Sequence, residues 1–398
     1  MLLRVGAVLL LVIALGAAVN YFRPIPAASA SAVLPPTDTT PGTAPTLPWP
    51  AHGSAAIAVG GLGMIASSGN EQPIAAASVT KVMTALVILE DKPMKKGESG
   101  PTITLTDVDV QSYKDDLAGN QSTVPVQAGE QLTELQALEG MLIPSANNLA
   151  ETLARWDLGS IPAFVAKMNA RAAALHLVHT KFADVSGASP DSVSTPSDLV
   201  ALGMAALQAQ EVITQIVGMG AAVLPVAGTV YNVDAALGQN GIFGIKTGSG
   251  LSSGANFLFA ANASVDGHTL VIYGCVMGQP TLDAAFAASK TLLAAVGAVL
   301  HVRRVIARNQ SIATYVTAWG EQTDLVSPVD VDLAEWPGMV LRQRLTARSI
   351  VVDQPIAPGT REGTEHLVLG DYSLDVPLVT ADPLYPPGRF WRVTRLSF

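Results

Sequence analysis

Three short motifs, which occur in a fixed order, constrain this chain more than any other feature of its sequence. They are Ser-x-x-Lys at residues 78–81, Ser-x-Asn at 145–147 and Lys-Thr-Gly at 246–248. Each motif alone is weak, because a chain of this length contains about one or two chance matches to Ser-x-x-Lys. Their order and spacing carry the information, with 67 residues from the first serine to the second and 101 from there to the lysine. The three motifs therefore act as one set.

The first motif lies at the start of an expected helix. Ala75-Ala76-Ala77 leads into Ser78, and apolar residues recur behind it at helical spacing, at positions 79, 82, 83, 86, 87 and 89. This pattern places Ser78 in the first turn of a buried helix, with Lys81 on the same face. Taken alone, Ser78 would be a helix N-cap and Lys81 a solvated lysine. The two later motifs, in order, favour a functional pair instead.

Composition excludes several classes of protein. Hydrophobic residues make up 49% of the chain and charged residues 14%, which indicates a globular protein rather than a disordered one. The net charge of −9 and the lack of a basic stripe exclude a nucleic-acid partner. The single cysteine, Cys275, cannot form an internal disulfide, and its apolar neighbours favour a core position over a reactive one.

The N-terminal segment, residues 1–30, is predicted to direct export. Arg4 precedes an uninterrupted apolar run over residues 5–19. Ala28-Ser29-Ala30 is a candidate cleavage site for a secretory signal. The stretch 2–22 is instead nearly long enough to span a bilayer as a retained anchor, and the length of the run favours this alternative. In both cases the rest of the chain is expected outside the cytoplasm, anchored to the membrane or secreted.

Residues 31–53 contain six prolines and read as a stalk. Proline at this density, mixed with threonine and alanine, cannot build a core and favours an extended polyproline II spacer. A disordered linker without a spacing role is an equal alternative. The sequence therefore predicts that the folded part begins near residue 54.

Residues 54–300 are expected to form an α+β domain. Two strand candidates at its start and three near its end predict an antiparallel sheet of about five strands, at 55–59, 63–66, 244–247, 256–261 and 269–277. The interval contains Ala- and Leu-rich helical stretches at 132–141, 147–156, 161–175 and 197–207, and a last helix is expected at 282–299. Residues 301–398 change to alternating patterns with Pro/Gly turns, which predicts a small all-β domain.

The motifs, their spacing and the β domain together resemble the low-molecular-weight penicillin-binding proteins, the serine D-alanyl-D-alanine carboxypeptidases of peptidase S11 type. The resemblance covers roughly residues 54–300 and, more loosely, 303–398. The stretches 180–187, 194–199 and 241–248 also look like segments that precede or contain the Lys-Thr-Gly strand in these enzymes. The resemblance implies a β-lactamase/transpeptidase-like domain, a five-stranded antiparallel sheet with helices, followed by a small all-β domain.

The resemblance also implies a role for each motif residue. Ser78 would attack the carbonyl carbon of a D-Ala-D-Ala peptide and form an acyl-enzyme, while Lys81, as a neutral amine, would accept its proton. Ser145 would relay protons, and the backbone N–H groups of residues 78 and 249 would form the oxyanion hole. The implied substrate-binding residues are Asn147, Lys246, Thr247, Gly248 and Ser249. The resemblance implies no metal and no cofactor.

The resemblance implies that the protein acts in the bacterial cell envelope on the terminal D-Ala of peptidoglycan stem peptides, with β-lactam antibiotics as covalent inhibitors. The apolar N-terminal segment would make the membrane a further partner if it is not cleaved. Two departures from the family pattern stand out. Asn148 occupies a position where the family often has Asp, and residues 278–286 contain no Arg, where relatives carry one for the substrate carboxylate. A catalytically weak scaffold that binds penicillin or peptidoglycan, and a DD-endopeptidase, therefore stay open. A class A β-lactamase is disfavoured, because residues 152–210 contain no Glu to activate a deacylating water.

Overall fold

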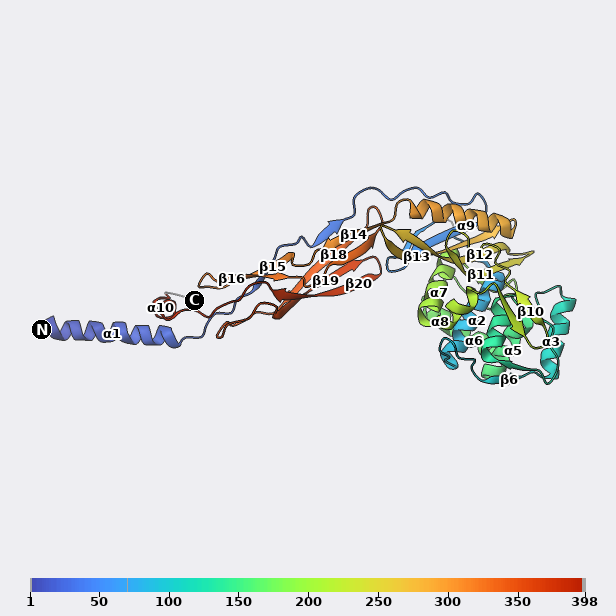
Figure 1. The fold of residues 1–398 in the computed structure, drawn as a ribbon, viewed down its shortest axis with the longest axis horizontal. Helices are drawn as coiled ribbons and strands as arrows, with labels where there is room; N and C mark the ends of the chain where they lie inside the picture. The colour runs from blue at the N-terminus through green and yellow to red at the C-terminus, as the bar shows by residue number, and fades with distance from the viewer. Residues whose placement is uncertain (1, 70, 396–398) are drawn as a thin grey trace. The chain divides into compact units, whose positions relative to one another are not determined.

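The structure is a computed structural model that describes residues 2–69 and 71–395 (Figure 1). The other residues, which fall in the predicted N-terminal segment, the catalytic domain and the C-terminal domain, lie outside the described residues: 1, 70 and 396–398. The chain divides into two compact units. One consists of Pro45–Leu300, and the other combines Met1–Ala44 with His301–Phe398.

The larger unit is built on a five-stranded antiparallel sheet with the strand order β11-β12-β13-β3-β4. Its strands are β3 (Ser54–Val59), β4 (Gly63–Ser67), β11 (Ile242–Gly250), β12 (Gly254–Val265) and β13 (His268–Gln279). The prediction of a sheet with two strands from the start of the domain and three from its end is confirmed. Cys275 lies on β13 and is fully buried.

Helices occupy the long interval between β4 and β11, and one more follows β13. They are the 3₁₀ turn η1 (Ala77–Thr80), α2 (Lys81–Asp91), α3 (Asp107–Ala118), α4 (Glu134–Leu142), α5 (Asn147–Leu158), α6 (Ile161–Ala174), α7 (Pro196–Ala209), α8 (Glu211–Val217) and α9 (Leu282–Gly297). Their starts follow local rules. For example, Pro196 occupies the first turn of α7, and the Thr195 side chain accepts a hydrogen bond from Asp198 N at 3.3 Å.

The two faces of the sheet pack against different helices. Successive residues of a strand point to opposite faces. Leu258 and Ala260 of β12 belong to the large core that contains α2 and α4–α8. Their neighbour Phe257 packs edge-on against Phe286 of α9, with ring centroids 4.9 Å apart. The sheet is therefore buried on both sides, which explains its almost continuous apolar strands.

Three short two-stranded ribbons complete the larger unit. They pair β5 (Ile74–Ala75) with β8 (Val193–Ser194), β6 (Thr102–Thr104) with β7 (Gln131–Thr133), and β9 (Ala221–Leu224) with β10 (Gly228–Tyr231). The β5–β8 ribbon stands directly before η1, where the first motif lies. It ties the chain ahead of Ser78 to the segment that precedes α7.

The smaller unit contains a seven-stranded sheet of order β1-β15-β16-β20-β19-β18-β2 and a separate β14–β17 pair. Its C-terminal strands are β14 (His301–Ile306), β15 (Ser311–Val316), β16 (Gln322–Val326), β17 (Val331–Glu335), β18 (Val340–Ala347), β19 (Arg361–Leu369) and β20 (Tyr372–Thr380). A short helix, α10 (Arg389–Thr394), follows the last strand. The C-terminal region is therefore rich in β structure, as predicted, but it is not all-β.

The structure differs from the predicted stalk at residues 31–53. The segments β1 (Ala30–Ala32) and β2 (Thr37–Thr39) pair with β15 and β18 and form the two edges of the seven-stranded sheet. Without them, β15 and β18 would be the edge strands and would present unpaired backbone groups, which the extended segments β1 and β2 satisfy. Pro35 and Pro36 lie between β1 and β2, where no ladder hydrogen bond is required.

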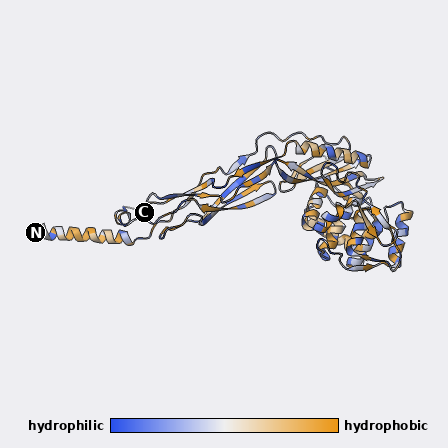
Figure 2. Cartoon of the chain, in the orientation of Figure 1, coloured by the Kyte–Doolittle hydropathy of each residue, from blue (hydrophilic) through white to orange (hydrophobic). Residues whose placement is uncertain are grey.

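The chain begins with one long apolar helix, α1 (Leu2–Phe22). Figure 2 shows it as almost uniformly hydrophobic. The part Arg4–Phe22 is long and apolar enough to cross a membrane, and none of its most apolar stretch is buried in the protein. This finding fits either a signal sequence or an anchor.

Candidate active site

The first motif brings a serine and a lysine into direct contact. Ser78 lies in η1, and Lys81 is the first residue of α2. Lys81 Nζ lies 2.8 Å from Ser78 Oγ. Lys81 is completely buried, whereas Ser78 is partly exposed. The hydroxyl therefore faces open space from one side and a buried amine from the other.

Two further oxygens surround the same amine. Lys81 Nζ donates to Asn147 Oδ1 at 2.6 Å and to the backbone oxygen of Ser186 at 2.9 Å. Burial lowers the pKa of Lys81 well below its usual value, and the positive charge of Lys246 lowers it further. The carboxylates of Asp184 and Asp116 act in the opposite direction but do not outweigh these effects.

Ser145 lies in the short connection between α4 and α5. Its backbone is in the left-handed region, with φ of +67°. The residue is buried, and its Oγ has no hydrogen-bond partner among the described residues. A buried hydroxyl without a partner is costly, which keeps Ser145 a candidate functional residue.

Asn147 and Asn148 begin α5 and have different hydrogen-bond partners. Asn147 faces the amine of Lys81, and its backbone N–H donates to the oxygen of Ser122 at 2.7 Å. Asn148 is fully buried and pairs with the backbone of Val124, donating from Nδ2 to its oxygen at 3.0 Å and accepting from its nitrogen at 3.2 Å. An amide can do both, whereas a carboxylate at Asn148 could not donate. The departure from the family pattern therefore has a structural use.

The third motif lies on β11, at the edge of the sheet nearest η1. A side-chain Cβ at Gly248 would meet Ser78 N and Ala76 O at 3.0 Å, so the absence of a side chain lets the strand backbone approach the serine closely. Thr247 is buried beside it, and Ser249 is exposed at the end of the motif. The structure thus brings all three motifs together around Ser78.

Lys246 is the second buried lysine of the site. Its exposed fraction is 2%, and its Nζ donates to the backbone oxygen of Thr247 at 3.1 Å. Burial lowers the pKa of Lys246 to about 7, and the negative charge of Asp234 opposes that shift. Burial also raises the pKa of Asp234 to about 6, against the opposing charge of Lys246. Near neutral pH, Lys246 is therefore poised between its charged and neutral forms.

A cleft with a volume of about 560 Å³ lies next to the site, and its lining includes Ser249 of the third motif and Ala77, the neighbour of Ser78. Its walls come from the segment before Ser78, the end of α3, the loop after Ser186 and the tip of the β11–β12 hairpin, and they include Ala77, Gln121, Gly187, Ala188, Ser249 and Leu251. A volume of this size accommodates a small ligand or the end of a peptide. Across residues 2–69 and 71–395, no three His, Cys, Asp or Glu residues are grouped so that they could hold a metal ion.

Sequence reasoning missed three contributors to the site. The backbone oxygen of Ser186 binds Lys81, and Asp184 holds that loop by accepting from Ser186 N at 3.2 Å and from Ala188 N at 2.8 Å. Asp234 acts on Lys246 through its charge. The Asp-x-Ser pattern at 184–186 is typical of an Asx turn and is the one local signal that could have revealed the loop. Asp234 carries no such signal.

Known proteins with similar sequences share the catalytic part of the chain. The peptidase S11 family model, described as D-alanyl-D-alanine carboxypeptidase, matches residues 53–281. The D-alanyl-D-alanine carboxypeptidase DacB2 of Mycobacterium tuberculosis is 34% identical over 227 residues, which cover 54% of this chain and 72% of the relative. The D-alanyl-D-alanine endopeptidase of Haemophilus influenzae is also 34% identical, over 146 residues that cover 37% of this chain and 46% of the relative.

Solved structures show the same fold at lower identity. Penicillin-binding protein 5 of Haemophilus influenzae matches with a TM-score of 0.63 and 18% identity, over 86% of this chain and 100% of its own. The DD-transpeptidase of Streptomyces K15 matches with a TM-score of 0.54 and 24% identity, over 64% of this chain and 98% of its own. The likeness to penicillin-binding protein 5 extends beyond the larger unit and agrees with the presence of a second, β-rich unit.

Proposed function

Because the chain belongs to the peptidase S11 family, the D-alanyl-D-alanine carboxypeptidases, we propose that it removes the terminal D-Ala from peptidoglycan stem peptides through an acyl-enzyme on Ser78. The observation that carries this proposal is the 2.8 Å approach of the buried amine of Lys81 to Ser78 Oγ beside an open cleft. The reaction is a hydrolysis, and β-lactams are expected to acylate the same hydroxyl.

The surroundings of Lys81 suit it to act as a base. A neutral amine has two hydrogens and one lone pair. The oxygen of Asn147 and the backbone oxygen of Ser186 accept both hydrogens, which leaves the lone pair for the hydroxyl of Ser78. The lowered pKa of Lys81, caused first by burial and then by the charge of Lys246, favours this neutral form.

Acylation then proceeds by attack of the serine, transfer of its proton and cleavage of the peptide bond. Ser78 Oγ bonds to the carbonyl carbon of the penultimate D-Ala, and its proton passes to Lys81. The developing oxyanion accepts hydrogen bonds from the backbone N–H groups of Ser78 and Ser249, which the close approach of β11 at Gly248 allows. The C–N bond breaks, and the proton held by Lys81 passes to the amine of the leaving D-Ala through the hydroxyl of Ser145, which has no hydrogen-bond partner among the described residues. Water then releases the shortened peptide from Ser78.

The remaining motif residues are assigned to substrate binding. Lys246 and Thr247 are proposed to hold the terminal carboxylate, since Lys246 supplies the positive charge of the third motif. Asn147 is proposed to contact the peptide amide in addition to Lys81. The absence of an arginine at residues 278–286 leaves Lys246 as the cation on which carboxylate binding depends.

Incubation with diacetyl-Lys-D-Ala-D-Ala and measurement of free D-Ala test the proposal. The wild type is expected to release D-Ala catalytically, and Ser78→Ala is expected to release none. Ser264→Ala, at an exposed position of β12 that does not line the cleft, is the matched control and should keep the wild-type rate. Stoichiometric penicillin binding without any D-Ala release would establish the weak scaffold instead.

An endopeptidase remains the second candidate, because relatives that carry this name align with the same region of the chain. Cross-linked dimeric muropeptides separate the two activities. A carboxypeptidase shortens the free stem peptide and leaves the cross-link intact, whereas an endopeptidase converts the dimer to monomers. We expect the first outcome. The work of the enzyme on peptidoglycan also requires that the chain after α1 lies outside the cytoplasm, in the cell envelope.

A further inference from the structure

Arg395, near the C-terminus, binds the end of α1. Arg395 has an exposed fraction of only 7%. Its guanidinium donates to three backbone oxygens in the last turn of the apolar helix and just after it, those of Asn20 at 2.8 Å, Arg23 at 2.5 Å and Pro24 at 3.0 Å. In return, Asn20 Nδ2 donates to the backbone oxygens of Val393 at 3.2 Å and Arg395 at 3.0 Å. This is a specific, reciprocal contact rather than a chance approach.

The candidate cleavage site is folded into the same unit. Ala28 is buried and forms a β-bridge with Ile350, in which each residue donates its N–H to the other at 2.8 and 2.9 Å. Ala30 begins strand β1, which pairs with β15. A chain cleaved after Ala30 would leave the buried guanidinium of Arg395 and the backbone of Ile350 without these partners. The fold is therefore completed by the residues that a signal peptidase would remove.

Exposed aromatic side chains surround the place where α1 ends. Phe22, Tyr385 and Phe390 have exposed fractions of 82%, 52% and 81%. Trp391 packs edge-on against Trp319, with ring centroids 5.5 Å apart. Arginine and aromatic side chains mix at this point, and Arg392 lies over the ring of Tyr21 at 5.8 Å. Such a mixture is typical of the boundary between lipid tails and head groups.

Helix α10 lies beside α1 and has an apolar face of its own (Figure 1). Phe390 and Val393 are three residues apart on one face, and both are exposed. Arg389 and Arg392 lie next to them in sequence, so the helix combines an apolar face with positive charge. In water this apolar face would stay exposed, because a helix of six residues is too short to bury it.

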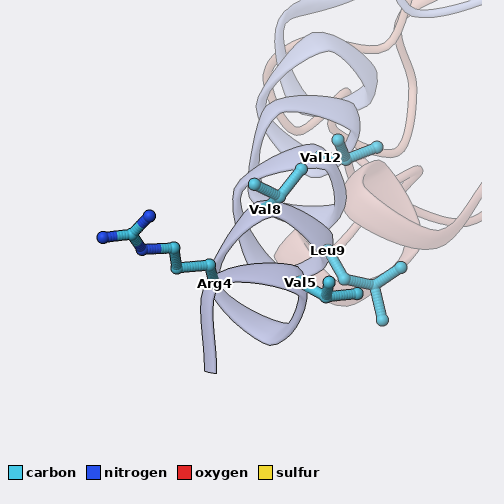
Figure 3. Close-up of a pocket in the computed structure, with 5 residues that line it drawn as sticks. All are labelled: Arg4, Val5, Val8, Leu9 and Val12. Atoms are coloured by element: carbon cyan, nitrogen blue, oxygen red, sulfur yellow. The ribbon is translucent and has the colours of Figure 1, made fainter. Parts of the chain in front are cut away.

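The apolar helix itself matches a bilayer in length. Its 21 residues span about 31 Å at about 1.5 Å per residue, close to the hydrocarbon thickness of a membrane. Its N-terminal half carries a shallow groove of about 590 Å³, lined by Arg4, Val5, Val8, Leu9 and Val12 (Figure 3). Apart from Arg4, this groove is lined by valine and leucine alone. Acyl chains are the natural occupants of such a surface.

We infer that α1 is a retained membrane anchor and that an exit collar, formed by Phe22, Tyr385 and α10, lies in the phospholipid head-group region on the outer side of that membrane. Arg395 joins the two, because it binds the chain where α1 leaves the bilayer. The collar therefore fixes the β-rich unit at the membrane surface, in addition to the tether that α1 supplies. This inference does not depend on the proposed catalytic function.

The first experiment determines whether the anchor is retained. Full-length protein exported in a bacterial host is extracted with alkaline carbonate, and its intact mass is measured. We expect the protein in the membrane pellet with a mass that includes α1. A protein whose N-terminus begins after Ala28 or Ala30, released to the supernatant, would overturn the inference. Penicillin labelling of the same fractions tests Ser78 separately, so the two proposals can fail independently.

The second experiment locates the collar. Full-length protein is reconstituted into phosphatidylethanolamine–phosphatidylglycerol vesicles that carry bromine either near the head groups or deep in the acyl chains. Tryptophan fluorescence is expected to be quenched more strongly by the shallow bromine, and Trp391→Phe should remove about half or more of this quenching. Trp156→Phe, in the larger unit, is the control and should remove none of it. Equal quenching in Trp391→Phe and wild type, or stronger quenching by the deep bromine, would contradict the collar.

A third variant isolates the apolar face of α10. Phe390→Ser removes the exposed phenylalanine ring of α10 without touching a hydrogen bond of the Arg395 contact. We expect weaker shallow quenching with an unchanged thermal melt and unchanged carbonate resistance. If quenching is unchanged, the face of α10 does not lie in the lipid.

Discussion

Lys81 Nζ lies 2.6 Å from Asn147 Oδ1, closer than the 2.8 Å that separates it from Ser78 Oγ. The second motif therefore binds the amine of the first motif, and Asn147 and the backbone oxygen of Ser186 engage two hydrogens of the proposed base. This relationship makes the charge and hydrogen-bonding capacity of residue 147 a direct control on the state of Lys81.

Asn147→Asp is expected to slow acylation at neutral pH. A carboxylate next to Lys81 stabilises its charged form and raises its pKa, which removes the neutral amine that accepts the proton of Ser78. The rate of penicillin acylation should then rise with pH over a higher range than in the wild type. The comparison is made by following acylation across pH. An unchanged profile would contradict the role of Lys81 as the base.

Replacing each buried lysine by arginine separates their roles. Lys81→Arg should lower acylation by about a hundredfold or more, because a guanidinium stays protonated and cannot accept a proton. Lys246→Arg should lower it less, by about tenfold, because there the positive charge is what the substrate needs. Thermal melts control for folding. Equal losses in two variants with intact melts would refute this division of roles.

The pH dependence of kcat/KM for D-Ala release should fall on the alkaline side near pH 7. The proposed mechanism requires neutral Lys81 and charged Lys246, and burial lowers the pKa of Lys246 to about 7. The rate therefore falls as pH rises through that value. Bound substrate adds a carboxylate that raises the pKa of Lys246, so kcat should persist to higher pH than kcat/KM. Coincident alkaline limbs for the two parameters would argue against Lys246 as the carboxylate ligand.

Asp234→Asn should move the same alkaline limb of kcat/KM to lower pH. The negative charge of Asp234 raises the pKa of Lys246, and its removal leaves burial unopposed. Asp191→Asn removes an equal charge from an exposed position and serves as the control, with an unshifted limb expected. A limb that moves equally in both variants would trace the effect to net charge rather than to Asp234.

Asn148→Asp is expected to destabilise the larger unit. The carboxylate would lose the hydrogen bond that Nδ2 donates to Val124 O and would face that oxygen with negative charge. The cost of such a buried mismatch is about 1–3 kcal/mol, which should lower the melting temperature by several degrees. Asn309→Asp, at an exposed turn, is the control. If the two variants melt alike, Asn148 has no structural role.

Sequence patterns were sufficient for the five-stranded sheet and for most of the helices of the larger unit, although not for α3, α8 or the two-stranded ribbons. The alternation and apolar runs of the strand candidates and the 3.6-residue periodicity of the helices are local properties of the chain, and each was recovered within a few residues in β3, β13, α5 and α7. The three motifs likewise predicted which residues meet around Ser78, because the proposed nucleophile, base and cationic strand leave a readable residue signature.

Tertiary structure alone decided the rest. The oxygen that binds Lys81 from Ser186 belongs to the backbone, so no side-chain identity could announce it. Asp234 acts on Lys246 through space, and its charge matters because both are buried together. The pairing of β1 and β2 with strands some 300 residues later, and the grip of Arg395 on Asn20, depend on long-range contacts that leave no local periodicity. The sequence determined which groups were present, and the fold determined which of them share a low-dielectric environment and therefore interact strongly.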